Sequence, residues 1–448
     1  MTLLAHGLGA VQDLPVPLWL FYYGAGAVLI ASFVALGALW RKPVLDRYAD
    51  GRPLSPTAQR ILLGPELRVV LGLISVALLV LVFATALVGE ESAATNLAPT
   101  FVYVVFWLGL VPVVVLIGNV WPALNPWKAT ADAVASIART PAAARYPERL
   151  GRWPAAVLLF AWAALELAYP NSASPRALAL AIALYSWATW TGMAVFGREA
   201  WLRNGDGFSV YFALLGRLAP LAVRDGRLVV RRPLAGLAGG DGTPGTTAVL
   251  AVMLGSVAFD GFSRTTWWQE QTFEIESRVV LDSPGLADLL TTGLNLVGLL
   301  GAVLAVATLF LVAVTAARRV GRRRDSLVDD FVLSLVPIAL VYVVAHYFTL
   351  LLVQGQAVWF MLSDPFGFGW NLFGTVDFEP NLNPLTPNGV WYIQVAALIA
   401  GHVLGLVLAH DRATALFGSA QAALRTQYVL LVLMVAYTVG GLWLLRSG

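Results

Sequence analysis

Residues 341–356 read VYVVAHYFTLLLVQGQ, an apolar stretch suited to the interior of a membrane that nevertheless carries a histidine near its centre. Residues 393–410 read IQVAALIAGHVLGLVLAH and carry a second one, His402. An ionisable side chain at membrane depth is costly and usually faces a partner or a polar cavity. The two stretches therefore predict a bundle of membrane helices and also indicate where its function lies.

The composition places the chain among membrane proteins. Hydrophobic residues make up 58% and charged residues 12% of it, against roughly 45–50% and about 25% in soluble proteins. The excess lies in long uncharged runs, so we expect an all-α polytopic bundle forming one domain over residues 1–448. The chain has no cysteine, which excludes disulfides, thiolate metal sites and cysteine nucleophiles. The expected partner is the lipid bilayer, and we expect no nucleic-acid partner.

Ten stretches have the composition of membrane spans, each of which needs about 20 mostly apolar residues. The two shortest candidates are 153–170 and 245–262. The ten predicted spans are 17–40, 68–89, 98–120, 153–170, 175–197, 245–262, 290–317, 331–354, 391–410 and 427–445.

The basic residues predict the orientation of the bundle. Alternate connections hold most of the Lys and Arg, including the run RRVGRRR at 318–324, whereas the others hold only Arg176, Arg264 and Arg278. The basic connections should be cytoplasmic. Both termini then lie outside, and the protein is predicted to be a multi-pass protein of the inner (plasma) membrane. The N-terminus lacks the positive region of a secretory signal, so we expect a retained external tail.

Two connections have unusual compositions. On the cytoplasmic side, 198–244 contains a short apolar segment and then VRDGRLVVRRP, which predicts an interfacial helix followed by a hairpin turning at Asp225-Gly226. On the outer side, 355–390 is long, acidic and rich in Trp, Pro, Gly and Asn. Its tryptophans suit the membrane interface, and the segment is also predicted to form a cap over a cavity.

Polar residues gather in the outer half of the predicted bundle. His346 lies about eight residues and His402 about eleven residues below the outer surface, a difference of roughly 5 Å in depth. Glu166 and Asp260 lie near the outer ends of their own spans. The first two spans hold nothing comparable, so we expect a polar cavity that opens outward to a small-molecule substrate.

These residue types suit several chemistries. Imidazoles and carboxylates are the ligands of zinc, copper or iron, so His346 and His402, completed by His6 of the external tail, form a candidate metal site. A bound metal would activate water, with Asp260 and Glu166 as candidate catalytic acids. Without a metal, a His–carboxylate pair serves as a general base or proton relay. Two facing histidines would also suit a bis-His haem for electron transfer.

Simpler interpretations stay open. A buried histidine is often a hydrogen-bonding strut between helices, and the chain contains no HxxxH or HExxH spacing. A transporter of small molecules or metals could use the same cavity. His410, at the cytoplasmic end of its span, is expected to be a solvated boundary residue.

A series of motifs along the chain resembles one family. The motifs include AHGLGAVQDLPVPLWL, GNVWPALNPW, GSVAFDGFSRTTWW, SDPFGFGWNLFG and VWYIQVAALIAGHVLGLVLAH. Together they resemble actinobacterial integral membrane proteins that carry the name fenitrothion hydrolase. The resemblance covers nearly the whole chain and implies hydrolysis of an organophosphorus triester. It assigns no catalytic residues.

Overall fold

The computed structural model describes residues 17–447 apart from 138–141, 281–283, 323–324 and 418. Within these ranges ten helical segments are long and apolar enough to cross a membrane, which confirms the ten predicted spans. They are formed by α1 (Leu18–Leu39), α3 (Pro65–Val88), α4 (Leu97–Thr100) with the π-helix η2 (Phe101–Leu108) and α5 (Leu110–Leu116), α8 (Trp153–Leu167), α9 (Pro175–Phe196), α12 (Thr246–Ser263), α14 (Pro284–Val320), α16 (Val336–Gln354), α18 (Pro387–Leu416) and α19 (Ala420–Ser447).

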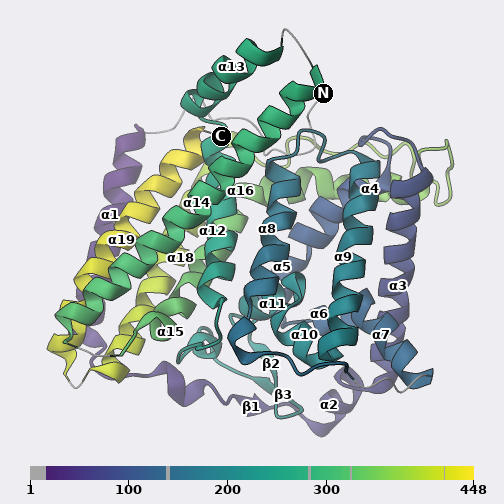
Figure 1. The fold of residues 1–448 in the computed structure, drawn as a ribbon. Helices are drawn as coiled ribbons and strands as arrows, with labels where there is room; N and C mark the ends of the chain where they lie inside the picture. The colour runs from purple at the N-terminus through teal and green to yellow at the C-terminus, as the bar shows by residue number, and fades with distance from the viewer. Residues whose placement is uncertain (1–16, 138–141, 281–283, 323–324, 418, 448) are drawn as a thin grey trace.

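Shorter helices connect these spans (Figure 1). They are α2 (Pro56–Leu62), α6 (Trp121–Leu124), α7 (Pro126–Ile137), α10 (Arg198–Asn204), α11 (Gly207–Leu215), α13 (Thr266–Val280), α15 (Val328–Phe331) and α17 (Val358–Ser363). The 3₁₀ turns are η1 (Leu45–Tyr48), η3 (Glu148–Leu150), η4 (Ala235–Leu237), η5 (Val332–Leu335) and η6 (Gly355–Ala357).

Local sequence signals set where several spans begin. Both α9 and α18 start with proline, which has the backbone angle of a helix and lacks the N–H that a first turn leaves unpaired. The residues before them, Ser174 and Thr386, accept hydrogen bonds from backbone N–H groups of the first turn. Such caps satisfy donors that no helix can pair internally.

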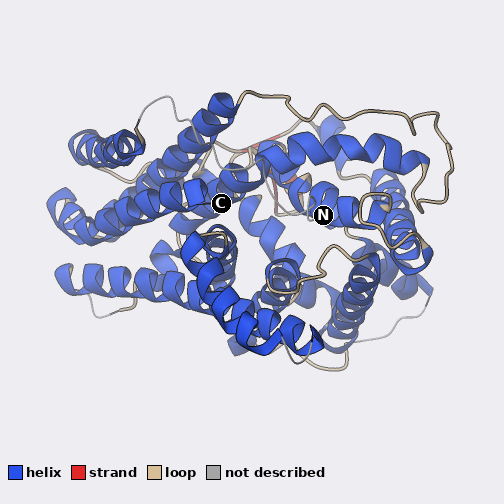
Figure 2. Ribbon diagram, turned by 90° about the horizontal axis from the view of Figure 1, so that it is seen from above, coloured by secondary structure: helices blue, strands red, loops and turns tan. Residues whose placement is uncertain are grey.

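The helices form two groups that meet at α8 and α12. Figure 1 places α1, α14, α16, α18 and α19 on one side and α3, α5, α7 and α9 on the other, and Figure 2 gives the view from above. Helix α12 packs against α8, α14, α16 and α19. It is the most enclosed span, with 67% of its most apolar window buried inside the protein.

A small sheet lies at the end of the bundle opposite α13 (Figure 1). Its strand order is β1 (Arg52–Pro53), β3 (Arg227–Val230), β2 (Leu221–Arg224), and both pairings are antiparallel. Strands β2 and β3 form the predicted hairpin, with Arg224 opposite Arg227. Asp225 and Gly226 have φ of 48° and 75°, the left-handed conformation that a two-residue hairpin turn requires.

The helix predicted to be interfacial, α11, instead lies within the protein. Seven of its nine residues are buried, and it packs against α5, α8 and α16. Asp206 accepts a hydrogen bond from the backbone N–H of Ser209 and others from the hydroxyls of Tyr185 and Thr189 on α9. Burial raises the pKa of Asp206. Because α11 is apolar on nearly every face, it has no polar side to keep in water, and that is why a surface position does not suit it.

The segment predicted as an outer cap packs over the ends of α3 and α4. The backbone N–H of Glu90 donates to the carbonyl of Phe366 over 2.8 Å, and Leu97 N–H donates to Pro365 over 3.1 Å. The hydroxyl of Ser363 accepts from the backbone N–H of Phe373, which folds the segment on itself. The loop therefore has a defined course although it contains little regular structure.

Candidate functional site

Asp260, near the end of α12, lies at the centre of a cluster of polar side chains. Its Oδ2 accepts a hydrogen bond from the hydroxyl of Tyr347 over 2.7 Å and lies 2.8 Å from Nε2 of His346. Its Oδ1 accepts from Nη2 of Arg264, one turn further along the chain, over 2.8 Å. The Asp260 side chain is 3% exposed, so a buried carboxylate has three partners that compensate for its lost hydration.

The cluster assigns the proton positions on His346. Because Asp260 is paired with a guanidinium and accepts from a phenol, its Oδ2 is an acceptor, and Nε2 of His346 must donate to it. In the neutral ring Nδ1 then carries the lone pair. Nδ1 has no hydrogen-bond partner among the described residues, and the side chain keeps 11% of its surface accessible. A carboxylate that orients an imidazole with a free nitrogen is the arrangement of a general base.

Neighbouring contacts hold helix α16 in place around His346. Gln394 on α18 donates a hydrogen bond over 2.8 Å to the backbone carbonyl of Ala345. The rings of His346 and Tyr347 are perpendicular, with centroids 4.7 Å apart. The imidazole is thus fixed by its own helix, by α12 and by α18.

A small cavity adjoins this cluster. It has a volume of about 20 Å³ and is lined by Tyr347 and Glu166, together with Trp107, Leu159, Trp162, Ala163, Leu167, Tyr211, Val252, Met253, Ser256, Val257 and Val343. That volume is enough for one water molecule. Glu166 has no hydrogen-bond partner in the described part of the chain.

Three residues that line this cavity each carry a buried polar atom without a partner among the described residues. These atoms are Nε1 of Trp107, Nε1 of Trp162 and the hydroxyl of Tyr211. The rings of Trp107 and Tyr211 are stacked with centroids 4.7 Å apart, and those of Trp107 and Trp162 lie 5.6 Å apart. Unpaired buried donors are uncommon and costly. Several at one cavity favour a site that binds an oxygen atom.

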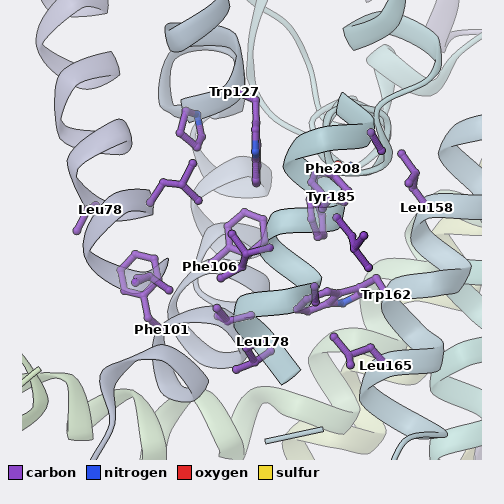
Figure 3. Close-up of a pocket in the computed structure, with 18 of the residues that line it drawn as sticks. Leu78, Phe101, Phe106, Trp127, Leu158, Trp162, Leu165, Leu178, Tyr185 and Phe208 are labelled. Atoms are coloured by element: carbon purple, nitrogen blue, oxygen red, sulfur yellow. Dashed lines mark hydrogen bonds between the residues drawn. The ribbon is translucent and has the colours of Figure 1, made fainter. Parts of the chain in front are cut away.

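Trp162 also lines a much larger apolar cavity (Figure 3). Its volume is about 870 Å³, and its walls come from α3, η2, α5, α6, α7, α8, α9 and α11. Phe101 and Phe106 of the π-helix project into it, whereas the next residue, Trp107, lines the small cavity. The wide turn of a π-helix is frequent at functional sites.

His402 is placed apart from the Asp260 cluster. Its side chain is fully buried on α18, and Nδ1 lies 2.8 Å from the backbone carbonyl of Leu398 one turn earlier. Its ring lies edge-on to Tyr342 with centroids 5.9 Å apart. Nε2 has no partner among the described residues. The environment around His402 is therefore apolar and aromatic.

The structure brings together some of the sequence-predicted residues. Asp260 and His346 are hydrogen-bonded, and Glu166 lines the small cavity that Tyr347 also lines. His402 does not join them, because its Nδ1 lies against the carbonyl of Leu398 and its Nε2 has no partner among the described residues. His6 lies outside the described residues. In the described part of the chain no group of three or more His, Asp or Glu side chains is arranged to hold a metal ion. The metal site stays a prediction.

Sequence reasoning missed the aromatic and cationic members of the site. Arg264 follows Asp260 by four residues, a helical ion-pair spacing that could have indicated it. Tyr347 follows His346 directly, and nothing in the sequence predicts that both reach one carboxylate. Trp107, Trp162 and Tyr211 come from three distant segments, so only the packed structure reveals their shared cavity.

Comparisons with known proteins found no relative of this chain. No protein-family model, curated protein or solved structure matches this chain. It is a polytopic α-helical membrane protein.

Proposed function

We propose that this protein is a membrane-embedded hydrolase of lipophilic esters in which His346 acts as the general base. The observation that carries the proposal is the 2.8 Å contact between Nε2 of His346 and Asp260, which leaves Nδ1 as an acceptor without a partner among the described residues. Arg264 supports the ionised form of Asp260 by pairing with its other oxygen. The sequence resemblance favours organophosphorus triesters as the substrate class.

In the proposed step a proton moves from water through His346 to the leaving group, and the bond to the leaving group is replaced by a bond to the water oxygen. Nδ1 of His346 takes a proton from water while the water oxygen bonds to the phosphorus, or to the carbonyl carbon of a carboxylic ester. The bond to the leaving alkoxide or phenoxide breaks, and that oxygen receives the proton from the imidazolium. Asp260 stabilises the imidazolium while it exists, as the carboxylate of a catalytic triad does.

The unpaired indole N–H donors could stabilise the negative charge that develops during hydrolysis. In the transition state, negative charge grows on the phosphoryl or carbonyl oxygen, and fixed N–H groups in a dry site stabilise it. Trp107 and Trp162 line the small cavity beside Tyr347, and their indole N–H groups have no partner among the described residues. Mutational losses for one such donor are about 10²–10³-fold in kcat.

The test uses purified protein in nanodiscs with two chromogenic substrates, a p-nitrophenyl phosphotriester and p-nitrophenyl butyrate. We expect His346→Gln and Asp260→Asn each to lower kcat by about 10²-fold or more. Tyr347→Phe, which keeps the ring, is expected to lower it less. Thermal unfolding followed by tryptophan fluorescence shows whether each variant is folded. Turnover by folded His346→Gln equal to that of the parent protein would refute the proposal.

His402→Leu separates the general-base mechanism from a metal-assisted one. Neither ring nitrogen of His402 bonds to the Asp260 cluster among the described residues, so the general-base proposal expects this variant to keep its activity. A metal held by both histidines would instead require both, and metal analysis of the purified protein would show it. A Soret band in the same sample would favour the haem alternative, and substrate uptake without hydrolysis would favour transport.

A further inference from the structure

We infer that the large apolar cavity binds the hydrocarbon chain of an amphiphilic substrate that enters sideways from the bilayer. This inference rests on the proposed function, because it identifies the substrate class of the same site. It assigns the cavity between α3, α8 and α9 to the apolar part of the molecule. The ester group would then lie at Trp162, where the two cavities meet.

The chemistry of the walls points to hydrocarbon. None of the described residues that line the cavity is charged, and most are Leu, Val, Ala, Phe or Trp. The volume of about 870 Å³ lies within the range of roughly 300–1,000 Å³ that holds small organic ligands. A polar ligand would lose its hydration here without gaining partners.

The cavity opens toward the surface of the protein that contacts lipid. Leu180, Leu184 and Trp187 on α9 both line the cavity and are 62%, 57% and 68% exposed. Their spacing of four and three residues puts them on one face of the helix. They lie in the middle of the span Pro175–Phe196, where the surroundings of a membrane protein are acyl chains. A molecule entering there comes from the bilayer.

The part of the cavity near Trp162 indicates where the ester group of the substrate would lie. Trp162 lines both cavities. On the same helix Leu165 lines the large cavity (Figure 3), and Glu166 lines the small one. A chain lying in the large cavity would therefore bring its polar end to the unpaired indole N–H of Trp162.

The first experiment measures occupancy without activity. Proteoliposomes containing the protein are mixed with methyl palmitate that carries a diazirine on its chain, irradiated, and digested for peptide mass spectrometry. We expect labelling concentrated on the α8 and α9 residues that line the cavity. Labelling spread evenly over lipid-facing helices such as α14 would overturn the inference.

Matched tryptophan variants sharpen this result. Ala181 lines the cavity, whereas Ala183, two residues along α9, is exposed and does not. We expect Ala181→Trp to fill the cavity and weaken cavity labelling about tenfold or more, corresponding to about 1.4 kcal/mol, and Ala183→Trp to leave it unchanged. Ala188→Phe, also on the cavity wall, repeats the test if Ala181→Trp does not fold. Equal labelling in the filled and unfilled variants would contradict the inference.

The second experiment separates this inference from the proposed function. We compare kcat/KM for p-nitrophenyl palmitate and p-nitrophenyl acetate in Ala181→Trp. A selective loss for palmitate is expected, whereas an equal change for both esters would overturn the chain-binding role while leaving hydrolysis intact. Cavity labelling in a protein that hydrolyses neither these esters nor a phosphotriester would refute the proposed function alone.

Discussion

Asp411 of α18 accepts a hydrogen bond of 2.8 Å from the indole Nε1 of Trp40, although 371 positions of sequence separate the two residues. The same carboxylate accepts from the backbone N–H of Val44 over 2.7 Å and, at 3.4 Å, from that of Leu45. Asp411 is 4% exposed. One buried carboxylate thus fixes the end of the first span to the ninth.

Removing this carboxylate should destabilise the protein. Asp411→Ala leaves three donors without an acceptor, and each buried unpaired donor costs about 1–3 kcal/mol. We expect a clear drop in the thermal unfolding temperature measured by tryptophan fluorescence. Asp377→Ala, at an exposed position of the 364–386 loop, serves as the control and should change it little. Equal unfolding temperatures for the two variants would contradict the structural role of Asp411.

Close packing of α16 on α18 predicts a second effect on stability. A Cβ atom at Gly401 would collide with the side chain of Val341, whereas one at Gly440 on α19 would meet nothing within 4 Å. Gly401→Ala should therefore lower the free energy of unfolding by about 1–3 kcal/mol, and Gly440→Ala should leave it unchanged or raise it slightly. The double variant Gly401→Ala with Val341→Ala should recover part of the loss. Failure of that rescue would show that this contact is not the cause.

Two tyrosines of the site should respond oppositely to loss of their hydroxyls. The Tyr347 hydroxyl donates to Asp260, whereas that of Tyr211 is buried without a partner among the described residues. Tyr347→Phe is expected to cost about 1–2 kcal/mol of stability, and Tyr211→Phe to be neutral or stabilising. If Tyr211 helps to bind substrate oxygen, its variant should still lose turnover. Thermal unfolding and p-nitrophenyl ester hydrolysis, measured on the same samples, give both results.

An ion cluster at the strand end of the bundle predicts a dependence on pH. Oδ2 of Asp241 accepts from Arg152 and Arg217, each over 2.8 Å. Burial alone would raise the pKa of Asp241, but the two guanidinium groups outweigh it and hold the pKa below its ordinary value. A carboxyl whose pKa is lower in the folded state stabilises the protein above the unfolded pKa of about 3.9, and this contribution is lost as the pH falls through the folded pKa.

Asp241→Asn tests that dependence. At neutral pH this variant should be less stable than the parent protein, and the difference should shrink on acidification below about pH 4. Asp225→Asn, at the exposed hairpin turn, is the control and should follow the parent curve. A constant difference between Asp241→Asn and the parent protein at every pH would exclude the ion cluster as its origin.

The predicted orientation is open to a direct test because the chain has no native cysteine. Arg227→Cys places one thiol on the hairpin, and Asn383→Cys places one on the 364–386 loop, both at exposed positions. The distribution of basic residues predicts that an impermeant maleimide labels Asn383→Cys in intact cells and Arg227→Cys only after permeabilisation. The reverse pattern would invert the predicted orientation.

The sequence predicted the number and approximate positions of the spans, because hydropathy reports directly on contact with lipid. It was less informative where helices contact protein. Helix α12 was one of the two shortest predicted spans. The structure gives the physical reason, because α12 is surrounded mostly by other helices and needs fewer apolar residues to contact lipid. Helix α11 was assigned to the surface for its shortness, but burial suits its apolar faces.

Pairing of polar groups was the least predictable property. Counting residues from the membrane surface placed His346, His402 and Asp260 at similar depth, but depth does not fix the direction in which a side chain points. His346 meets Asp260, whereas His402 bonds within its own helix. The expectation of a solvated His410 was wrong. It is 1% exposed, with Nδ1 3.0 Å from Gln427 Oε1 and Nε2 2.9 Å from the carbonyl of Trp40.

The tie between Trp40 and Asp411 also bears on how the chain is assembled during synthesis. Helix α1 packs against α18 and α19, which leave the ribosome long after it does. Helix α1 must therefore remain surrounded by lipid until α18 and α19 have been synthesised and inserted. A chain cut short before α18 would leave α1 without these neighbours and Trp40 without its acceptor. Quality-control factors in the membrane could then distinguish the unfinished protein by this unpaired helix.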